Sequence, residues 1–345
     1  MEPDRRGIVY ALASAALFGV SAPIAKVLLG DVSPWLLAGL LYLGSGLGLA
    51  AVRPLLPRHE AGLQRRDWPW LGAAILFGGV IGPVLLMVGL AASAAGTASL
   101  LLNLESVLTL AIAWIVFREN VDRRLMVGAA AIVAGAIILT WPGEISQASI
   151  VSSLAIAGAC LAWAIDNNLT RKVSGADPTQ IAMLKGLIAG TVNTAIAFAL
   201  GATVPGIGAV ASAAILGFFS YGISLTAFVI ALRHLGTART GAYYALAPFI
   251  GAGAAVLMLH EPITLPFVAG GILMAIGLWL HLTERHEHGH VHENLEHEHA
   301  HVHDAHHHHS HAPGTPPEPH THRHRHVRLK HDHPHYPDLH HRHTH

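Results

Sequence analysis

The stretch GTASLLLNLESVLTLAIAWIVFRE, residues 96–119, decides the fold, because GTARTGAYYALAPFIGAGAAVLMLHE at residues 236–261 repeats its layout. Both stretches begin with Gly-Thr-Ala, continue as an apolar run and end on a glutamate. Inside the run, the first copy has Asn-Leu-Glu-Ser at residues 103–106, where the second has Ala-Leu-Ala-Pro at 245–248. The chain therefore contains an internal repeat of an apolar segment.

The chain around these stretches is almost continuously apolar up to residue 282. Hydrophobic residues make up 52% of the 345 residues and charged residues 12%. A helix of about 20 apolar residues crosses a bilayer core roughly 30 Å thick. Ten runs have about that length: 8–29, 33–52, 68–90, 97–117, 124–141, 150–170, 179–200, 209–231, 239–259 and 263–282. The sequence thus predicts an all-α, polytopic membrane protein with ten transmembrane helices.

The ten predicted helices divide into two sets of five, residues 8–141 and 150–282, followed by a tail at 283–345. Because five is odd, the second set must cross the bilayer in the opposite sense to the first. Inverted repeats of this kind are typical of secondary transporters, whose substrate site lies near the midplane between the halves. The sequence predicts this architecture and a site between the two sets.

Basic residues occupy only every second connection between the predicted helices. Thirteen arginines and lysines lie there: Arg5, Arg6, Arg53, Arg58, Arg65, Arg66, Arg118, Arg123, Arg124, Arg171, Lys172, Arg233 and Arg239. The alternate connections have none. By the positive-inside rule the N-terminus is cytoplasmic, and ten crossings return the C-terminus to the same side. We therefore expect a multi-pass protein of the plasma (inner) membrane with both termini in the cytoplasm.

At residues 96–119, 163–171 and 231–262 the chain resembles the drug/metabolite transporter superfamily, and more narrowly its EamA-type family of ten-helix carriers. The resemblance implies a pseudosymmetric helical bundle with a central cavity that moves small organic solutes, often outward. The family is functionally mixed, so the substrate does not carry over. The chain departs from the family's pattern at Ser106, where proline is common, and this leaves a matching helix break in the fourth run open.

Glu105 is the first candidate for the substrate site, because it lies in the middle of the fourth apolar run. An ionised carboxylate at the centre of a membrane helix costs roughly 2.5–3.5 kcal/mol on insertion scales. The side chain would therefore bind a cationic group or carry a coupling proton. The alternative is a structural role, in which a protonated or ion-paired Glu105 holds two helices together.

Asp166, Asn167 and Asn168 lie on consecutive positions of the sixth run, so they cannot all face lipid. Trp163 lies four residues before Asn167 and shares its helix face. These four residues are therefore candidates for binding substrate. The alternative for Asp166 is an ion pair with a nearby basic residue at the membrane boundary.

Four further residues are weaker candidates. Lys26 and Lys185 lie near the ends of predicted helices, where long side chains extend toward the interface, and they are also possible ion-pair partners of Glu105 or Asp166. Asn103 belongs to the substrate set, although amides also join helices at about 1 kcal/mol. Tyr244 would line the pocket or serve as an interfacial aromatic.

The tail is the second notable feature of the sequence. Of the 28 histidines only His59, His234 and His260 lie before residue 281. Alternating histidines form three runs: His286, His288, His290 and His292; His297, His299, His301 and His303; and His320, His322, His324 and His326. The segment has no apolar periodicity and is predicted to be disordered without ligand. Imidazole suits divalent transition metals, so we expect weak sites for Ni, Co or Zn.

The leading hypothesis is a secondary transporter that exports a small organic metabolite or drug-like solute. Its partners would be the bilayer, the solute and transition-metal ions, with a homodimer left open and no cofactor required. One alternative is a Ni, Co or Zn transporter or a metal-regulated carrier, and a weaker one is a membrane-anchored metal store. The formal net charge of zero gives no reason to expect nucleic acid. The sequence has neither a Gly-x-Ser-x-Gly elbow nor a phosphate-binding Gly-Lys-Ser/Thr loop, so no enzyme is predicted.

Overall fold

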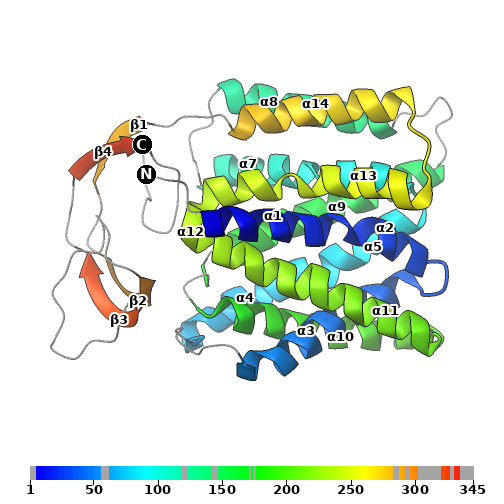
Figure 1. Cartoon of the computed structure of the whole chain (residues 1–345), viewed down its shortest axis with the longest axis horizontal. Helices are drawn as coiled ribbons and strands as arrows, with labels where there is room; N and C mark the ends of the chain where they lie inside the picture. The colour runs from blue at the N-terminus through cyan, green and yellow to red at the C-terminus, as the bar shows by residue number, and fades with distance from the viewer. Residues whose placement is uncertain are drawn as a thin grey trace.

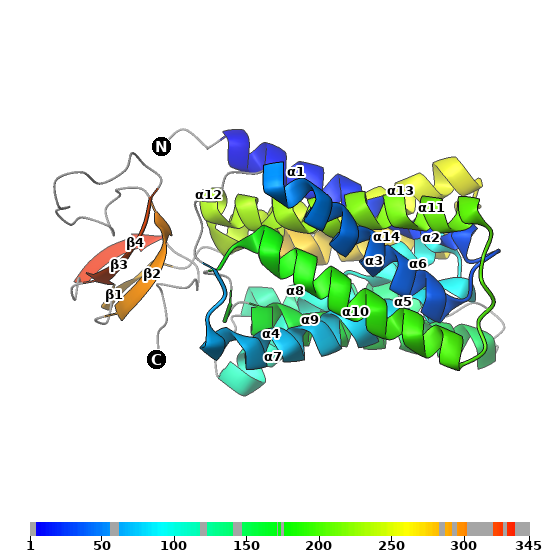
Figure 2. The same ribbon diagram turned by 90° about the horizontal axis from the view of Figure 1, so that it is seen from below.

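The computed structural model describes residues 5–55, 62–117, 123–140, 147–170, 172–173, 176–282, 287–291, 295–301, 320–326 and 330–334. Its α-helices are α1 Arg5–Gly19, α2 Ser21–Leu28, α3 Pro34–Val52, α4 Trp68–Ala74, α5 Gly82–Ala91, α6 Ala95–Leu101, α7 Leu104–Phe117, α8 Arg123–Thr140, α9 Gln147–Thr170, α10 Pro178–Ala199, α11 Ile207–Gly217, α12 Ser224–Tyr244, α13 Ala247–Leu259 and α14 Leu265–Leu282. Two short 3-10 helices are η1 Arg53–Leu55 and η2 Arg65–Asp67. The helices form one bundle with their axes in roughly one direction (Figures 1 and 2).

The bundle has the helix lengths of a polytopic membrane protein, as predicted. Within the described residues, eight helical stretches are long and apolar enough to cross a membrane: Arg6–Leu28, Pro34–Leu55, Arg65–Ala91, Ala95–Val116, Arg123–Thr140, Ile150–Thr170, Pro178–Ala199 and Ile207–Ala231. Two shorter apolar helices, Ala247–Leu259 and Leu265–His281, occupy the ninth and tenth predicted places. Large apolar side chains such as Leu257 and Ile207 are exposed on the outside of the bundle, as a lipid-facing surface requires.

Irregular backbone occurs at matching places in the two sets of five helices. A π-helical segment, η3 Ile75–Ile81, joins α4 to α5, and another, η4 Phe218–Ile223, joins α11 to α12. The chain also leaves the α-helical path at residues 102–103, between α6 and α7, and at 245–246, between α12 and α13. π-Helical turns are rare and occur frequently at functional sites. Their recurrence marks the region where the site is to be sought.

Small residues let helices from the two sets of five approach closely. A Cβ atom added to Gly186 of α10 would lie 2.5 Å from the backbone nitrogen of Gly46 in α3. Another added to Gly277 of α14 would lie 2.5 Å from the carbonyl oxygen of Gly128 in α8. In a membrane, where no hydrophobic force drives helices together, such backbone contacts supply the packing. The two sets are therefore held to one another along α3–α10 and α8–α14.

Four short strands lie in the described part of the tail: β1 Glu287–Val291, β2 Leu295–His301, β3 His320–His326 and β4 Lys330–Pro334. β1 pairs antiparallel with β4, and β2 with β3. The prediction that the tail is disordered without ligand stays a prediction. The register places His297, His299 and His301 opposite His324, His322 and His320, in that order.

Candidate substrate cavity

A cavity of about 410 Å³ lies inside the bundle between helices of both sets. Its described lining includes Phe18, Tyr42, Ser45, Asn103, Glu105, Ser106, Thr109, Trp163, Asp166, Asn167, Lys185, Ser220, Tyr221, Ser224, Phe228, Tyr244, Pro248 and His281. A pocket with apolar and aromatic walls and a few converging polar groups is the usual form of a small-molecule site. Seven of the nine residues proposed from the sequence as substrate ligands or ion-pair partners lie on its wall.

Glu105 lies at a break in the helix, which explains how a carboxylate is accommodated there. α6 ends at Leu101 and α7 begins at Leu104, so Glu105 belongs to the first turn of α7. In this irregular turn the N–H groups of Glu105 and Ser106 donate to the carbonyls of Leu102 and Asn103, and the helix dipole favours negative charge at that end. The chain thus provides a polar backbone environment at the depth where an acid side chain is otherwise most costly.

The break forms although Ser106 replaces the proline that is common in the family. The Ser106 hydroxyl donates to the Asn103 carbonyl at 2.7 Å, and the Asn103 side-chain amide donates to the Leu100 carbonyl at 2.9 Å. The same two carbonyls also accept backbone N–H groups, from Ser106 at 3.2 Å and from Asn103 at 3.0 Å, so the side-chain bonds add to those of the irregular turn. The break that the sequence left open is present without a proline ring.

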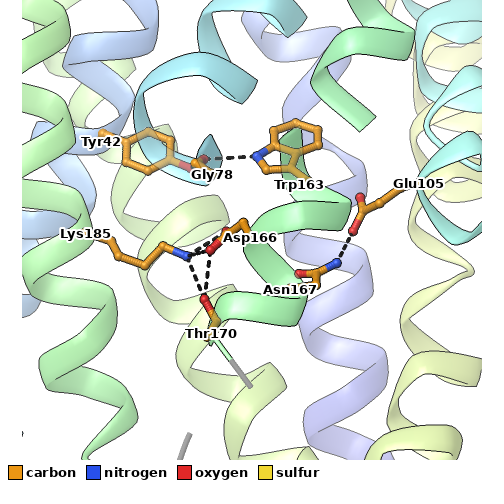
Figure 3. Close-up of polar contacts among 8 residues, drawn as sticks. All are labelled: Tyr42, Gly78, Glu105, Trp163, Asp166, Asn167, Thr170 and Lys185. Atoms are coloured by element: carbon orange, nitrogen blue, oxygen red, sulfur yellow. Dashed lines mark hydrogen bonds and ion pairs between the residues drawn. The ribbon is translucent and has the colours of Figure 1, made fainter. Parts of the chain in front are cut away.

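Asn167 is the hydrogen-bond partner that the structure gives to Glu105. Its side-chain Nδ2 donates to Oε1 of Glu105 at 2.7 Å, across the cavity from α9 to α7 (Figure 3). An amide donates to a carboxylate without neutralising it. Neither proposed lysine reaches Glu105, since Lys185 binds Asp166 and Lys26 donates to the carbonyls of Leu90 and Ala91.

Asp166 and Lys185 form a buried ion pair, as one of the two hypotheses for Asp166 expected. The Lys185 ammonium donates to both carboxylate oxygens at 2.6 and 2.7 Å, and Thr170 donates to Oδ1 of Asp166 at 2.8 Å. Lys185 is 5% exposed and Asp166 7%. Lys185 therefore does not extend toward the interface, because its partner lies one helix away inside the bundle (Figure 3). Asn168 donates to the carbonyl of Ala164 on its own helix and does not line the cavity.

The π-helical segment η3 fixes two aromatic side chains at the cavity wall. The Gly78 carbonyl accepts from the Tyr42 hydroxyl at 2.7 Å and from Nε1 of Trp163 at 3.1 Å (Figure 3). A carbonyl inside a regular α-helix would be committed to its own ladder. Gly78 also allows the Asp166 carboxylate to lie against the backbone, since an added Cβ would collide with it. Trp163 and Asp166 are thus positioned together.

Aromatic rings from α1, α3, α9, η4 and α12 meet on the wall of the cavity that Glu105 also lines. Phe18 contacts Trp163 edge-on with centroids 6.2 Å apart, Tyr221 at 5.8 Å and Tyr244 at 5.7 Å. Tyr42 packs on Tyr221 at 5.4 Å. The Tyr221 hydroxyl is buried and has no hydrogen-bond partner among the described residues. A ligand group in the cavity would supply that missing partner.

Comparison with known proteins identifies the family. The EamA-like transporter family matches the chain over residues 5–141 and again over 150–283. The chain belongs to this family. An uncharacterized transporter of Methanothermobacter thermautotrophicus is 27% identical over 292 residues, covering 79% of this chain and 85% of the relative. The uncharacterized transporter YvbV of Bacillus subtilis is 25% identical over 277 residues, covering 78% and 88%.

The fold is also seen experimentally. A protein crystal structure aligns with a TM-score of 0.61 at 19% identity, covering 80% of this chain and 98% of the other. The family assignment makes this chain a polytopic membrane transporter, in agreement with the resemblance noted from the sequence. The matched family is a transporter family, and both relatives are transporters by description.

One end of the bundle of this EamA-like transporter is held together by Lys26 and by Glu261, a residue to which the sequence analysis assigned no role. Both oxygens of Glu261, just after α13, accept backbone N–H groups at the start of α6, from Ala95 at 2.6 Å and Gly96 at 2.8 Å. Lys26 of α2 donates to the carbonyls of Leu90 and Ala91 at 2.8 and 3.0 Å. We call this group the Glu261 latch. The recurring glutamate at the end of both repeated stretches was the available signal, but its partner lies in the other half of the chain.

The histidines proposed as metal ligands fall partly outside the described residues. His286, His292 and His303 are not described, and for the others the structure gives the strand backbone only. In the part of the chain that was searched, no group of three or more His, Cys, Asp or Glu side chains is arranged to hold a metal ion. Metal binding by the tail therefore stays a prediction.

Proposed function

We propose that the protein is a secondary transporter that moves a small organic solute through the central cavity, outward from the cytoplasm. The observation that carries the proposal is the position of Glu105, at a helix break inside an aromatic-walled cavity lined by both sets of helices. Discontinuous helices near the midplane are the places where transporters bind solutes and ions. The proposal places both termini in the cytoplasm, in agreement with the distribution of basic residues.

The cavity extends toward the end of the bundle where α1 begins and α14 ends. Its lining residues on α9, α10 and α14 (Trp163, Asp166 and Asn167; Lys185; His281) lie in the halves of those helices nearest that end. The Glu261 latch lies at the opposite end. This arrangement supports a cytoplasm-facing state, in which the solute enters from inside and the outer end is closed. Export would require the latch to open while the inner ends of the helices approach each other.

Flux into proteoliposomes tests the function directly. We expect uptake of at least one member of a panel of amino acids, nucleosides, amines and Ni, Co and Zn ions, measured at two pH values. Glu105→Gln should abolish or strongly reduce that flux, because it removes the charge while keeping the shape. Asp31→Asn, the same chemical change at an exposed residue between α2 and α3, is the matched control. Flux that is unchanged and pH-independent in Glu105→Gln would remove Glu105 from the mechanism.

A second candidate function is regulation by transition metals, which the histidine runs of the tail favour. Metal as the cargo has less support, because the cavity offers one histidine, His281, and the described residues contain no ligand cluster. Deletion of residues 286–345 separates the accounts. A solute carrier should keep its flux, a metal-regulated carrier should lose only its response to added Ni, Co or Zn, and a metal store should lose metal retention with no flux to lose.

A further inference from the structure

The positive and negative charges of the side chains that line the cavity do not cancel. The described lining contains two carboxylates, Glu105 and Asp166, and one ammonium group, Lys185, but no arginine. Lys185 is committed to Asp166 through both carboxylate oxygens. His281, the remaining titratable nitrogen group on the wall, has Nε2 within 3.1 Å of the Leu125 carbonyl. The pair cancels, so one negative charge remains when Glu105 is ionised.

The groups around Glu105 complement a cation and not an anion. Its described partner is the neutral amide of Asn167, which leaves the other carboxylate oxygen available to accept from a ligand. The aromatic rings of Phe18, Tyr221 and Tyr244 form the neighbouring wall. Ring faces attract ammonium groups, and aromatic walls with a nearby acid are typical of sites for organic cations. The free hydroxyl of Tyr221 adds one more acceptor.

We infer that the cavity binds organic cations: a primary or substituted ammonium group placed against Glu105 and attached to a flat, apolar body that lies along the aromatic wall. This inference rests on the proposed function and narrows its substrate class. An anionic or neutral solute of the same shape would leave the Glu105 carboxylate without a cation in a poorly solvated cavity. The charge of the ligand should therefore determine specificity more than its shape does, because the apolar wall accepts many flat ring systems.

Three ligands with one ring system and different charges test the inference: tryptamine, which is cationic, 3-ethylindole, which is neutral, and indole-3-propionate, which is anionic. Binding to the full-length protein in detergent is measured by calorimetry, and flux is measured in proteoliposomes. We expect tryptamine to bind at least about tenfold more tightly than either of the others. Glu105→Gln should remove that preference while leaving the affinity for 3-ethylindole within about twofold, and Asp31→Asn should change neither.

Tyr221→Phe provides a second variant that keeps the ring and removes the hydroxyl group. It should weaken tryptamine binding by several-fold, with less effect on 3-ethylindole. Equal affinities for the three ligands, or a preference for the anion, would overturn the inference even if other solutes of the panel are transported in a Glu105-dependent manner. Failure of the proposed function looks different: the ligands bind with the expected order of affinity, but no solute crosses the membrane.

Discussion

Glu105 and Asp166 are two acids on facing helices of one cavity, and they are satisfied in different ways. Asp166 on α9 has an ammonium partner and a hydroxyl partner and is buried with them. Glu105 on α7 has an amide partner, at the broken end of its helix, and faces the cavity. A fully paired charge can hold helices together but offers little to a ligand. The comparison supports a structural role for Asp166 and, within the proposed function, a binding role for Glu105.

The strongest test of this comparison removes the cation. Lys185→Met should destabilise the protein by about 3–5 kcal/mol, because it leaves the Asp166 carboxylate buried without its partner. The double variant Asp166→Asn with Lys185→Met should recover most of that loss, since no buried charge then remains. Thermal unfolding in detergent of the two single variants and the double variant measures the coupling. A double variant as unstable as Lys185→Met would mean that the pair does not hold the helices.

The Glu261 latch offers a third acid, satisfied by two backbone N–H groups of α6. Bonds made by a charged group contribute about 1.5–3 kcal/mol each, and glutamine keeps one acceptor, so Glu261→Gln should cost about 2 kcal/mol. The larger consequence should be functional, because in the proposed cytoplasm-facing state the latch closes the outer end of the bundle. A cysteine placed at Thr109 on the cavity wall should react faster with a membrane-impermeant thiol reagent added from outside when Glu261 is replaced.

Cys160, the protein's single cysteine, is buried and serves as the background in that experiment. Protein that lacks the Thr109 cysteine should show no labelling from outside, whether residue 261 is Glu or Gln. Outside reactivity at Thr109 that does not respond to Glu261→Gln would show that the latch is packing only. The Glu261 end of the bundle would then have no special part in controlling access to the cavity.

Sequence alone predicted the number and class of the helices, because apolar length is set by bilayer thickness. It also singled out Glu105, Asp166 and Asn167, since ionisable and amide groups are expensive at that depth. Other features depend on contacts between distant segments. The π-helical segments at 75–81 and 218–223 have no sequence signature, and the partner of Lys185 depends on the helix register.

The positions of the aromatic residues in the cavity also could not be predicted from the sequence. Phe18 and Tyr42 line the cavity. In an apolar run, however, the sequence does not distinguish an aromatic side chain that faces lipid from one that faces a neighbouring helix or a cavity. Asn168 was proposed with its two neighbours, and a rotation of about 100° per residue turns it onto a different face of α9. Only the packing of α9 against α7 and α5 decides which of three consecutive polar residues reaches the cavity.

Replacing Glu105 itself should have little effect on stability. Glu105→Gln should change the free energy of unfolding by less than about 1 kcal/mol, because Asn167 still has an oxygen to donate to and no buried cation is left unpaired. This small change sharpens the contrast with Lys185→Met. Thermal unfolding in detergent checks it on the same preparations used for flux. A loss as large as that of Lys185→Met would show that Glu105, too, is a structural acid.

The smallest expected effect concerns the helix break that positions Glu105. Ser106→Pro removes the hydroxyl bond and the longer backbone N–H bond to the Asn103 carbonyl, a loss of about 1–1.5 kcal/mol, but restricts the unfolded chain, a gain of about 0.4–1 kcal/mol. Proline is tolerated in a first helical turn, and Pro248 occupies the matching turn of α13. Stability should therefore fall by less than about 1 kcal/mol, and flux should persist.

Ser106→Ala is the informative partner of that substitution, because it loses the hydroxyl group without gaining the ring. It keeps the backbone N–H bond to Asn103 and should be less stable than the wild type by about 1 kcal/mol in thermal unfolding, and no more stable than Ser106→Pro. The order matters more than the size. If alanine and serine are equally stable while proline abolishes folding, the breaks at 102–103 and 245–246 are not equivalent, and the backbone at Glu105 is held by packing alone.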